Sequence, residues 1–261
     1  MRWTGEVERG RWYRERLIES WGSIHFVSPS GFDAYARVFH PAERDRLVAP
    51  ETWRGWTPGG THLSEIERER VSWATVATAF GTTMHPLAQF DRLRAGEPDR
   101  NDHFLDAQDW RYAEPRQGHL DAVSVTALAR HLERHTGTPH AGIIAVWEGW
   151  GGMFQPGGSD EGTLLETPWR RHLMFEASVS ELAAAGWPES APWVSHSWDA
   201  ESPSIIWPED LAWASATEVD FDSTIVAGSR ALIDELVDSS TVEALEIDST
   251  ADLTVNGDHL N

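Results

Sequence analysis

Residues 204–224 read SIIWPEDLAWASATEVDFDST, and this stretch decides the expected fold. Taken as an extended strand, residues 213–222 alternate between two faces, because successive side chains of a strand point in opposite directions. One face carries the larger apolar residues: Trp213, Val219 and Phe221. The other face starts with alanines and ends with three carboxylates: Glu218, Asp220 and Asp222. The pattern predicts a strand with one buried face, followed by like charges that need solvent, arginine or a cation.

The three carboxylates allow three interpretations. In the first, the strand leaves the sheet at an acidic turn, and Asp222 bonds to the nearby backbone. In the second, the acids dock a basic partner. In the third, they form a catalytic or metal-binding cluster, for which Mg²⁺ or Ca²⁺ would be the suitable ion. The Asp-x-Asp spacing alone does not decide between them.

The rest of the chain mixes strand and helix patterns without a regular βαβ alternation. Strands are predicted where β-branched and aromatic residues are bounded by Gly, Pro or Asp: 23–27, 35–39, 142–147, 172–176, 204–207, 213–221 and 242–247. Helices are predicted after the capping residues Ser72, Ser124 and Ser229, and over 178–186. This mixture favours an α+β fold, with a mixed or mainly antiparallel sheet and short helices packed on it.

The length of 261 residues allows one large domain or two small ones. We expect a single α+β domain over 1–248, with a subdivision near 95–120 or 148–168, where loop-forming residues gather. The remaining residues, 249–261, have the composition of a weakly anchored tail.

The charge is unevenly distributed along the chain. There are 42 acidic residues and 21 basic ones, all of them arginine. Residues 1–171 carry a net charge of −4, whereas residues 172–261 carry −17. The last third is therefore expected to repel nucleic acid and to attract a basic protein partner. The segment 9–17 interleaves arginines with aromatic residues, a pattern that also suits nucleic acid, but we expect it to lie against these acids of the same chain or of a second copy.

Composition also bounds the location of the protein. There is no cysteine, which excludes disulfides and favours a reducing compartment. No apolar run approaches the roughly 20 residues that a membrane span needs. We therefore expect a cytoplasmic protein without membrane attachment. The oligomeric state is not indicated.

Fifteen tryptophans are a second unusual feature. Residues 145–162 read AVWEGWGGMFQPGGSDEG, so Trp147, Glu148 and Trp150 stand where a strand opens into glycines. Such a segment is either a long connection packed on its own aromatic residues or a ligand-binding loop. Together with Trp207 and the three carboxylates of the opening stretch, these residues are the candidate ligand or partner site.

Other motifs are weaker. His131 and His135 have the i, i+4 spacing of a metal-binding pair, but His-Glu-x-x-His is absent, so a surface pair is expected and no metal site is assigned. Residues 76–90 resemble a helix-turn-helix in spacing, yet the anionic charge disfavours DNA binding. The chain has neither a P-loop nor Gly-x-Ser-x-Gly, and no cofactor is indicated.

Two runs carry a resemblance: GFDAYARVFHPAE (31–43) and WPEDLAWASATEVDFDSTIVAGS (207–229). They are similar to segments of uncharacterised proteins from high-GC Gram-positive, actinobacterial species. More distantly, an acidic, tryptophan-rich α+β chain resembles the SUKH-type immunity proteins, which bind and neutralise toxins. The detailed Leu-Pro and Gly-Gly motif of that family is not clearly present, and no site residue is transferred.

Two function classes therefore stand ahead of DNA binding. The first is an acidic binding module, immunity-like or inhibitor-like, that engages a basic partner through the last third. The second is a carboxylate-based hydrolase with a tryptophan-lined site, for which sugars are the candidate substrates. Its candidate carboxylates are Glu148, Glu218, Asp220 and Asp222.

Overall fold

The computed structural model describes residues 1–48, 52–55, 65–99, 101–150 and 163–261. These residues form two compact units. Unit 1 contains Met1–His40 and Gln117–Thr254, and unit 2 contains Pro41–Arg116 and Val255–Asn261. The sequence predicts a single domain over 1–248 with a subdivision near 95–120 or 148–168. The boundary after Arg116 lies inside the loop-rich 95–120 segment, while the boundary after His40 follows a strand and is marked in the sequence by Pro41 alone.

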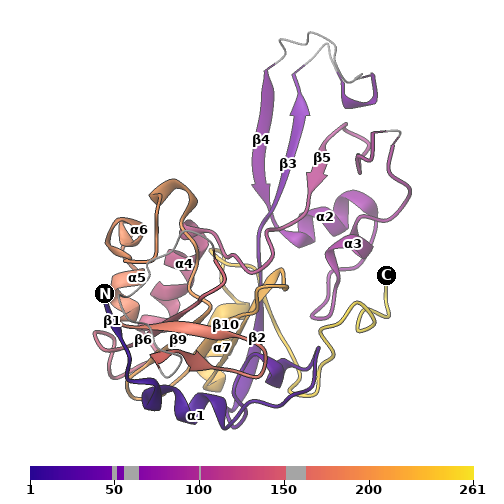
Figure 1. The fold of residues 1–261 in the computed structure, drawn as a ribbon. Coiled ribbons are helices and arrows are strands. Elements are labelled where there is room, and N and C mark those ends of the chain that lie inside the picture. The colour runs from indigo at the N-terminus through magenta and orange to yellow at the C-terminus, as the bar shows by residue number, and fades with distance from the viewer. Residues whose placement is uncertain (49–51, 56–64, 100, 151–162) are drawn as a thin grey trace. The chain divides into compact units, whose positions relative to one another are not determined.

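The described part of unit 1 is built on a nine-stranded sheet (Figure 1). Its strands lie in this order: β1 (Arg2–Thr4), β8 (Arg171–Glu176), β6 (Gly142–Trp147), β9 (Ile205–Pro208), β10 (Ala214–Thr217), β11 (Ser223–Gly228), β2 (Ala34–Phe39) and β12 (Ala244–Glu246), with β7 (Leu165–Glu166) also paired to β8. All neighbours are antiparallel. The expected α+β class with a mainly antiparallel sheet is confirmed.

One face of this sheet carries the helical core. The helices that pack there are short: α4 (Ala122–Glu133), α5 (Val179–Leu182), α6 (Trp187–Ser190) and α7 (Arg230–Val237). They bury aliphatic side chains against alternate strand residues such as Val38, Ile144 and Phe175. This period-two pattern is what fixes which face of each strand is apolar.

The opposite face is covered by the N-terminal segment of unit 1. That segment contains η1 (Val7–Gly10), α1 (Arg11–Arg14) and η2 (Ile24–Phe26). The ring of Tyr13 stacks on Trp207 with centroids 5.7 Å apart, and both side chains are buried. The strand predicted over 23–27 is wrong, because Ser23 caps a 3-10 turn there instead.

The helix caps follow the sequence in part. Ser229 accepts a bond from Leu232 N–H and starts α7, as predicted. In α4, however, Asp121 is the cap and Ser124 lies inside the helix, so the predicted start is three residues late. The Asp121 carboxylate accepts from the N–H groups of both Val123 and Ser124, which makes it the stronger cap.

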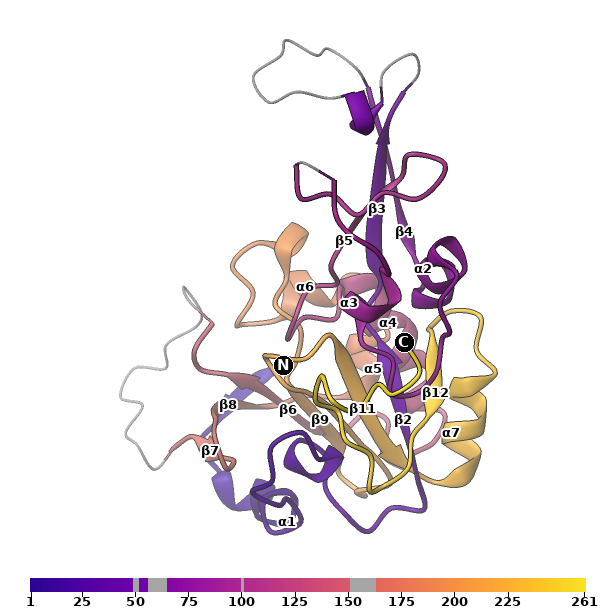
Figure 2. The same ribbon diagram turned by 90° about the vertical axis from the view of Figure 1, so that its right-hand side faces the viewer.

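Unit 2 has its own three-stranded antiparallel sheet in the order β4-β3-β5 (Figure 2). Its strands are β3 (Ala42–Leu47), β4 (Ile66–Val71) and β5 (Arg111–Ala113). The predicted helix after Ser72 is confirmed as α2 (Trp73–Phe80), which ends at Gly81 with φ +71°, and it is followed by the one-turn α3 (Phe90–Leu93). A single turn is too short to be the recognition helix of a helix-turn-helix.

The opening stretch ends its strand earlier than expected. β10 stops at Thr217, and residues 218–222 form the turn that leads into β11. Gly118, at φ +65°, lies so close that an added Cβ would be 2.5 Å from the Val219 carbonyl oxygen, so a side chain there would displace the hairpin. The interpretation of an acidic turn at the end of a strand describes this geometry.

Within the described residues, no helix combines the length and apolar character required to cross a membrane.

Candidate functional site

Arg170 gathers two of the predicted carboxylates at the β10–β11 hairpin. Its Nη2 atom lies 2.8 Å from Glu218 Oε1 and 2.7 Å from Asp220 Oδ2. Because both oxygens contact the same nitrogen, they are no more than 5.5 Å apart. The guanidinium also lies over the Trp147 ring, 5.5 Å from its centroid. A cation, an aromatic face and two carboxylates thus meet at one end of the large sheet.

The two carboxylates have different surroundings. Glu218 is 8% exposed, and burial raises its pKa against the opposing effect of Arg170. The Asp220 side chain is 58% exposed and reaches solvent beside the same guanidinium. A buried acid with a raised pKa next to a solvated one is the arrangement that separates an acid from a base in hydrolytic sites.

His172 is a buried titratable group at this end of the sheet, which sequence patterns do not mark. It lies opposite Trp147 in the β6–β8 ladder. Burial lowers its pKa to about 4, so the imidazole is neutral at pH 7. Its Nδ1 atom has no hydrogen-bond partner. A neutral imidazole here avoids placing a second cation next to Arg170.

Asp222, the third predicted carboxylate, faces a different arginine. Its Oδ1 atom lies 3.2 Å from Nη2 of Arg37, whose side chain is 2% exposed. Arg37 also donates from Nε to the Ser223 hydroxyl at 2.8 Å. The guanidinium is therefore buried within the sheet and held by the start of β11, and Asp222 has a role in the fold there rather than in a shared site.

Glu148 and Trp150 lie beside Trp147, while Trp207 does not. Glu148 forms an ion pair with Arg171 at 2.6 Å. The Trp150 ring meets Trp147 edge to face with centroids 5.3 Å apart. Trp207 is buried under the N-terminal segment and takes no part. Most of the predicted glycine-rich loop, 151–162, lies outside the described residues.

Two exposed tryptophans near the hairpin were missed by the sequence analysis. Trp169 precedes Arg170 and is 65% exposed. Trp21 is 53% exposed and packs against Phe221 of the hairpin, with centroids 5.5 Å apart. Their exposure could not be deduced from the sequence, because seven other tryptophans are buried and nothing in the sequence separates the two groups.

His131 and His135 share one carboxylate rather than a metal. Nδ1 of His131 and Nε2 of His135 each lie 2.7 Å from an oxygen of Glu235 on α7. Burial opposes ionisation of Glu235, but hydrogen bonds from His135, Arg134 and His131 outweigh it and lower its pKa to about 2. In the part of the chain that the structure describes, no three His, Asp or Glu residues are placed to hold a metal ion.

The acids of the last third are partly matched by arginines of the same chain. Arg9 contacts both Glu176 and Glu209, so the expectation that segment 9–17 lies against these acids is confirmed at Arg9. Arg2 also pairs with Glu176. These pairs, with those of Arg37 and Arg170, set four arginines against five acids at the hairpin and around it.

A different acidic surface remains in unit 1, formed by residues 230–248 and called here the α7–β12 surface. This segment contains six acidic residues and one arginine. Arg230 pairs with Glu246, while Asp234 and Asp238 are exposed on α7. Figure 2 shows β12 at the sheet edge beside β2, and α7 packs on both strands. The sequence analysis counted these acids but did not name them as site residues.

Unit 2 contains a separate cavity of about 380 Å³ against β3 and β5. Its charged lining is mixed: Glu43, Arg44, Asp45, Arg68, Asp102, His103 and Arg111. Arg111 donates to both oxygens of Asp45, at 2.9 and 2.7 Å. Because the acids match the cations, the cavity has no clear preference for an anion, and we assign no ligand to it.

No family model, no curated protein and no solved structure matches this chain.

Proposed function

We propose that this protein is an acidic binding module whose partner is a basic protein, and that the α7–β12 surface is its contact region. The observation that carries the proposal is the net charge of unit 1. This unit holds 11 arginines against 28 acidic residues, a net charge of −17. Unit 2 holds 10 arginines against 14 acidic residues, a net charge of −4.

Internal ion pairs cannot remove this excess. Each pair uses one arginine and one acid, so the excess of acidic residues over arginines stays the same whichever pairs form. On the α7–β12 surface, Glu246 pairs with Arg230 and Glu235 with Arg134 of α4, but Asp234 and Asp238 are exposed, so this surface is a natural location for part of the excess. A negative surface accelerates encounter with a positive partner and suppresses binding to nucleic acid phosphates.

The favoured partner class is a basic protein such as a toxin, which an immunity-type or inhibitor-type protein would neutralise. Lack of cysteine fits a reducing compartment, so we place this encounter in the cytoplasm.

The test measures association of the full chain with a basic peptide of alternating Arg and Ala, at salt concentrations from low to high. We expect the association rate to fall at least tenfold as salt is raised, because the steering is electrostatic. The double variant Asp234→Asn, Asp238→Asn should bind several-fold more slowly than the native chain. Glu189→Gln removes one exposed acid elsewhere on unit 1 and serves as the control. Salt-independent binding, or equal loss in the control, would contradict the proposal.

A second candidate function is a hydrolase that acts on sugars at the hairpin end of the sheet. It is favoured by the convergence of Glu218 and Asp220 within 5.5 Å on Arg170 over Trp147. Retaining glycosidases use two carboxyl groups about 5–5.5 Å apart, one with a raised pKa. Glu218 would be the acid and Asp220 the nucleophile.

A panel of aryl glycosides tests this candidate by release of the coloured phenol. Any hydrolysis by the native chain should disappear in Glu218→Gln and persist in Glu148→Gln, whose carboxylate pairs with Arg171 instead. Hydrolysis at the same rate in Glu218→Gln, or none in the native chain, would remove this candidate.

A further inference from the structure

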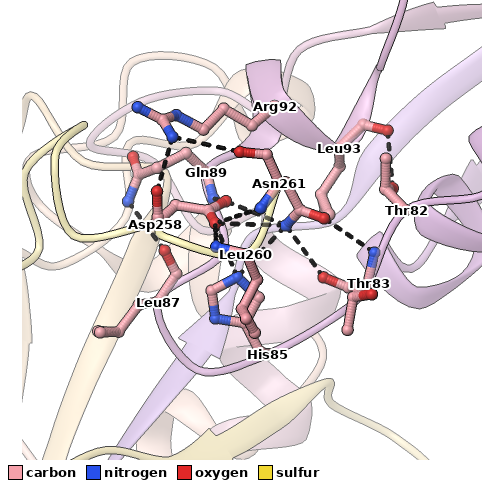
Figure 3. A network of polar contacts seen from close by, with 10 residues as sticks. All are labelled: Thr82, Thr83, His85, Leu87, Gln89, Arg92, Leu93, Asp258, Leu260 and Asn261. Carbon is pink, nitrogen blue, oxygen red and sulfur yellow. Dashed lines mark hydrogen bonds and ion pairs between the residues drawn. The ribbon is translucent and has the colours of Figure 1, made fainter.

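The last seven residues described in unit 2, 255–261, bind the loop between α2 and α3, residues 81–89 (Figure 3). We call residues 255–261 the tail segment. Asn261 makes a two-way contact with Thr83. The Thr83 N–H donates to Asn261 Oδ1 at 2.9 Å, and Asn261 Nδ2 donates to the Thr83 carbonyl at 3.1 Å. The main chain of Thr83 thus bonds to both the acceptor oxygen and the donor nitrogen of the Asn261 side chain.

Asp258 is the second anchor of the tail segment. It is 1% exposed, and its Oδ1 atom lies 2.9 Å from His85 Nε2. Its Oδ2 atom accepts from the Gln89 N–H at 3.1 Å, and Arg92 donates to its main-chain carbonyl at 2.6 Å. Figure 3 shows these groups converging from both ends of the loop. The sequence composition predicted a weakly anchored tail, and the structure instead buries one of its carboxylates.

The apolar residues of the tail segment contribute little to this attachment. Val255 is 60% exposed and Leu260 is 68% exposed. Attachment therefore depends on the polar contacts of Asp258 and Asn261, which are three residues apart. Asp258 is the buried side chain of the tail segment, so release of the segment exposes a carboxylate but no apolar core, and we expect the segment to open more readily than the core of unit 2.

We propose that the α2–α3 loop is a recognition site for a peptide segment of another protein that carries Asp and, three residues later, Asn, and that the tail segment occupies this site in cis. Thr83 reads the Asn amide, while His85, Gln89 N–H and Arg92 read the Asp residue. A free peptide must compete for the loop with the tail segment, whose effective concentration is on the order of 1 mM because it is part of the same chain. The tail segment is therefore an intramolecular competitor, and it raises the concentration or affinity that a partner peptide needs in order to occupy the loop.

The experiment uses the full chain and a capped peptide, acetyl-VNGDHLN-amide, which copies residues 255–261. The double variant Asp258→Ala, Asn261→Ala releases the tail from the loop. We expect the peptide to bind this variant at least tenfold more tightly than the native chain. Peptides carrying Asp258→Asn or Asn261→Ala should lose at least tenfold in affinity, whereas His259→Ala, at an exposed position, should bind as the native peptide does.

A second measurement covers the case in which the double variant does not fold. The chain has no cysteine, so Leu260→Cys provides a single labelling site at an exposed tail position. Excess native peptide should lower the fluorescence anisotropy of a label there, because the displaced tail moves freely, and the Asp258→Asn peptide should not. Unchanged anisotropy, or equal effects of the two peptides, would overturn the proposal.

Discussion

The β10–β11 hairpin and the α7–β12 surface are both rich in acids, yet they differ in what faces them. In the hairpin, Arg170 contacts both Glu218 and Asp220, and Arg37 contacts Asp222. On the α7–β12 surface, Arg230 pairs with Glu246 and Arg134 of α4 pairs with Glu235, whereas Asp234 and Asp238 are exposed on α7. The density of acids along a sequence therefore does not determine surface charge, which depends on the arginines that neighbouring strands bring close.

Among the variants that test this comparison, Arg37→Met should cause the largest loss of stability. It leaves Asp222 and Ser223 without their buried guanidinium, and removing one partner of a buried ion pair costs about 3–5 kcal/mol. Urea unfolding followed by tryptophan fluorescence measures the loss. Arg230→Met is the matched control, because both members of its pair are about half exposed and it should cost less than about 1 kcal/mol. Equal losses in the two variants would mean that the hairpin arginines are no more structural than the exposed one.

Arg170→Ala should have an intermediate effect that depends on pH. The pKa of Glu218 is already raised, so the folded state holds its proton more tightly than the unfolded state does. Stability from this group is therefore present below the unfolded pKa of about 4.3 and is lost as pH rises through the folded value. Without Arg170 the loss should grow by about 1–3 kcal/mol at pH 7.

The double variant Arg170→Ala, Glu218→Gln sharpens this test. It should recover much of the lost stability at pH 7 and flatten the pH profile between pH 4 and pH 7, measured as urea midpoints. A profile as steep as that of Arg170→Ala alone would place the responsible group elsewhere.

Glu235→Gln should have the smallest effect on stability. The pKa of Glu235 is lowered to about 2, so its contribution is present above the unfolded pKa of about 4.3 and disappears as pH falls towards 2. Its partial exposure limits the contribution to less than about 1 kcal/mol. Asp234→Asn, on the exposed side of the same helix, should leave the acid denaturation curve unchanged. A shift of similar size in both variants would contradict the difference between paired and open acids.

Local signals in the sequence recover local structure. Ser72 and Gly81 correctly bound α2, and the apolar run 142–147 coincides with β6. The strands of unit 2 were missed because AERDRL and IERERV carry charges on both faces, and their stability comes from cross-strand pairs such as Arg44 with Glu69.

The candidate site was recovered less well, for a physical reason. Trp147, Glu218 and Asp220 meet as expected for a shared site, whereas Trp207 and Asp222 do not. Arg170 lies 48 residues before Glu218 in the sequence, and no periodicity reports which arginine will reach which acid. The pairing emerges only when β6, β8 and β10 are assembled in the sheet.

Strand β2 has a consequence for how the protein is made. Its six residues are all buried, and it lies between β11 and β12. Phe39 is separated from its partner Ser223 by 184 residues, and Ala36 from Glu246 by 210. At about 5–20 residues per second, a ribosome needs about 10 to 40 s to deliver the first partner. During that interval both edges of this strand stay unpaired, so the nascent chain is expected to depend on a chaperone that covers residues 34–39 until translation passes β11.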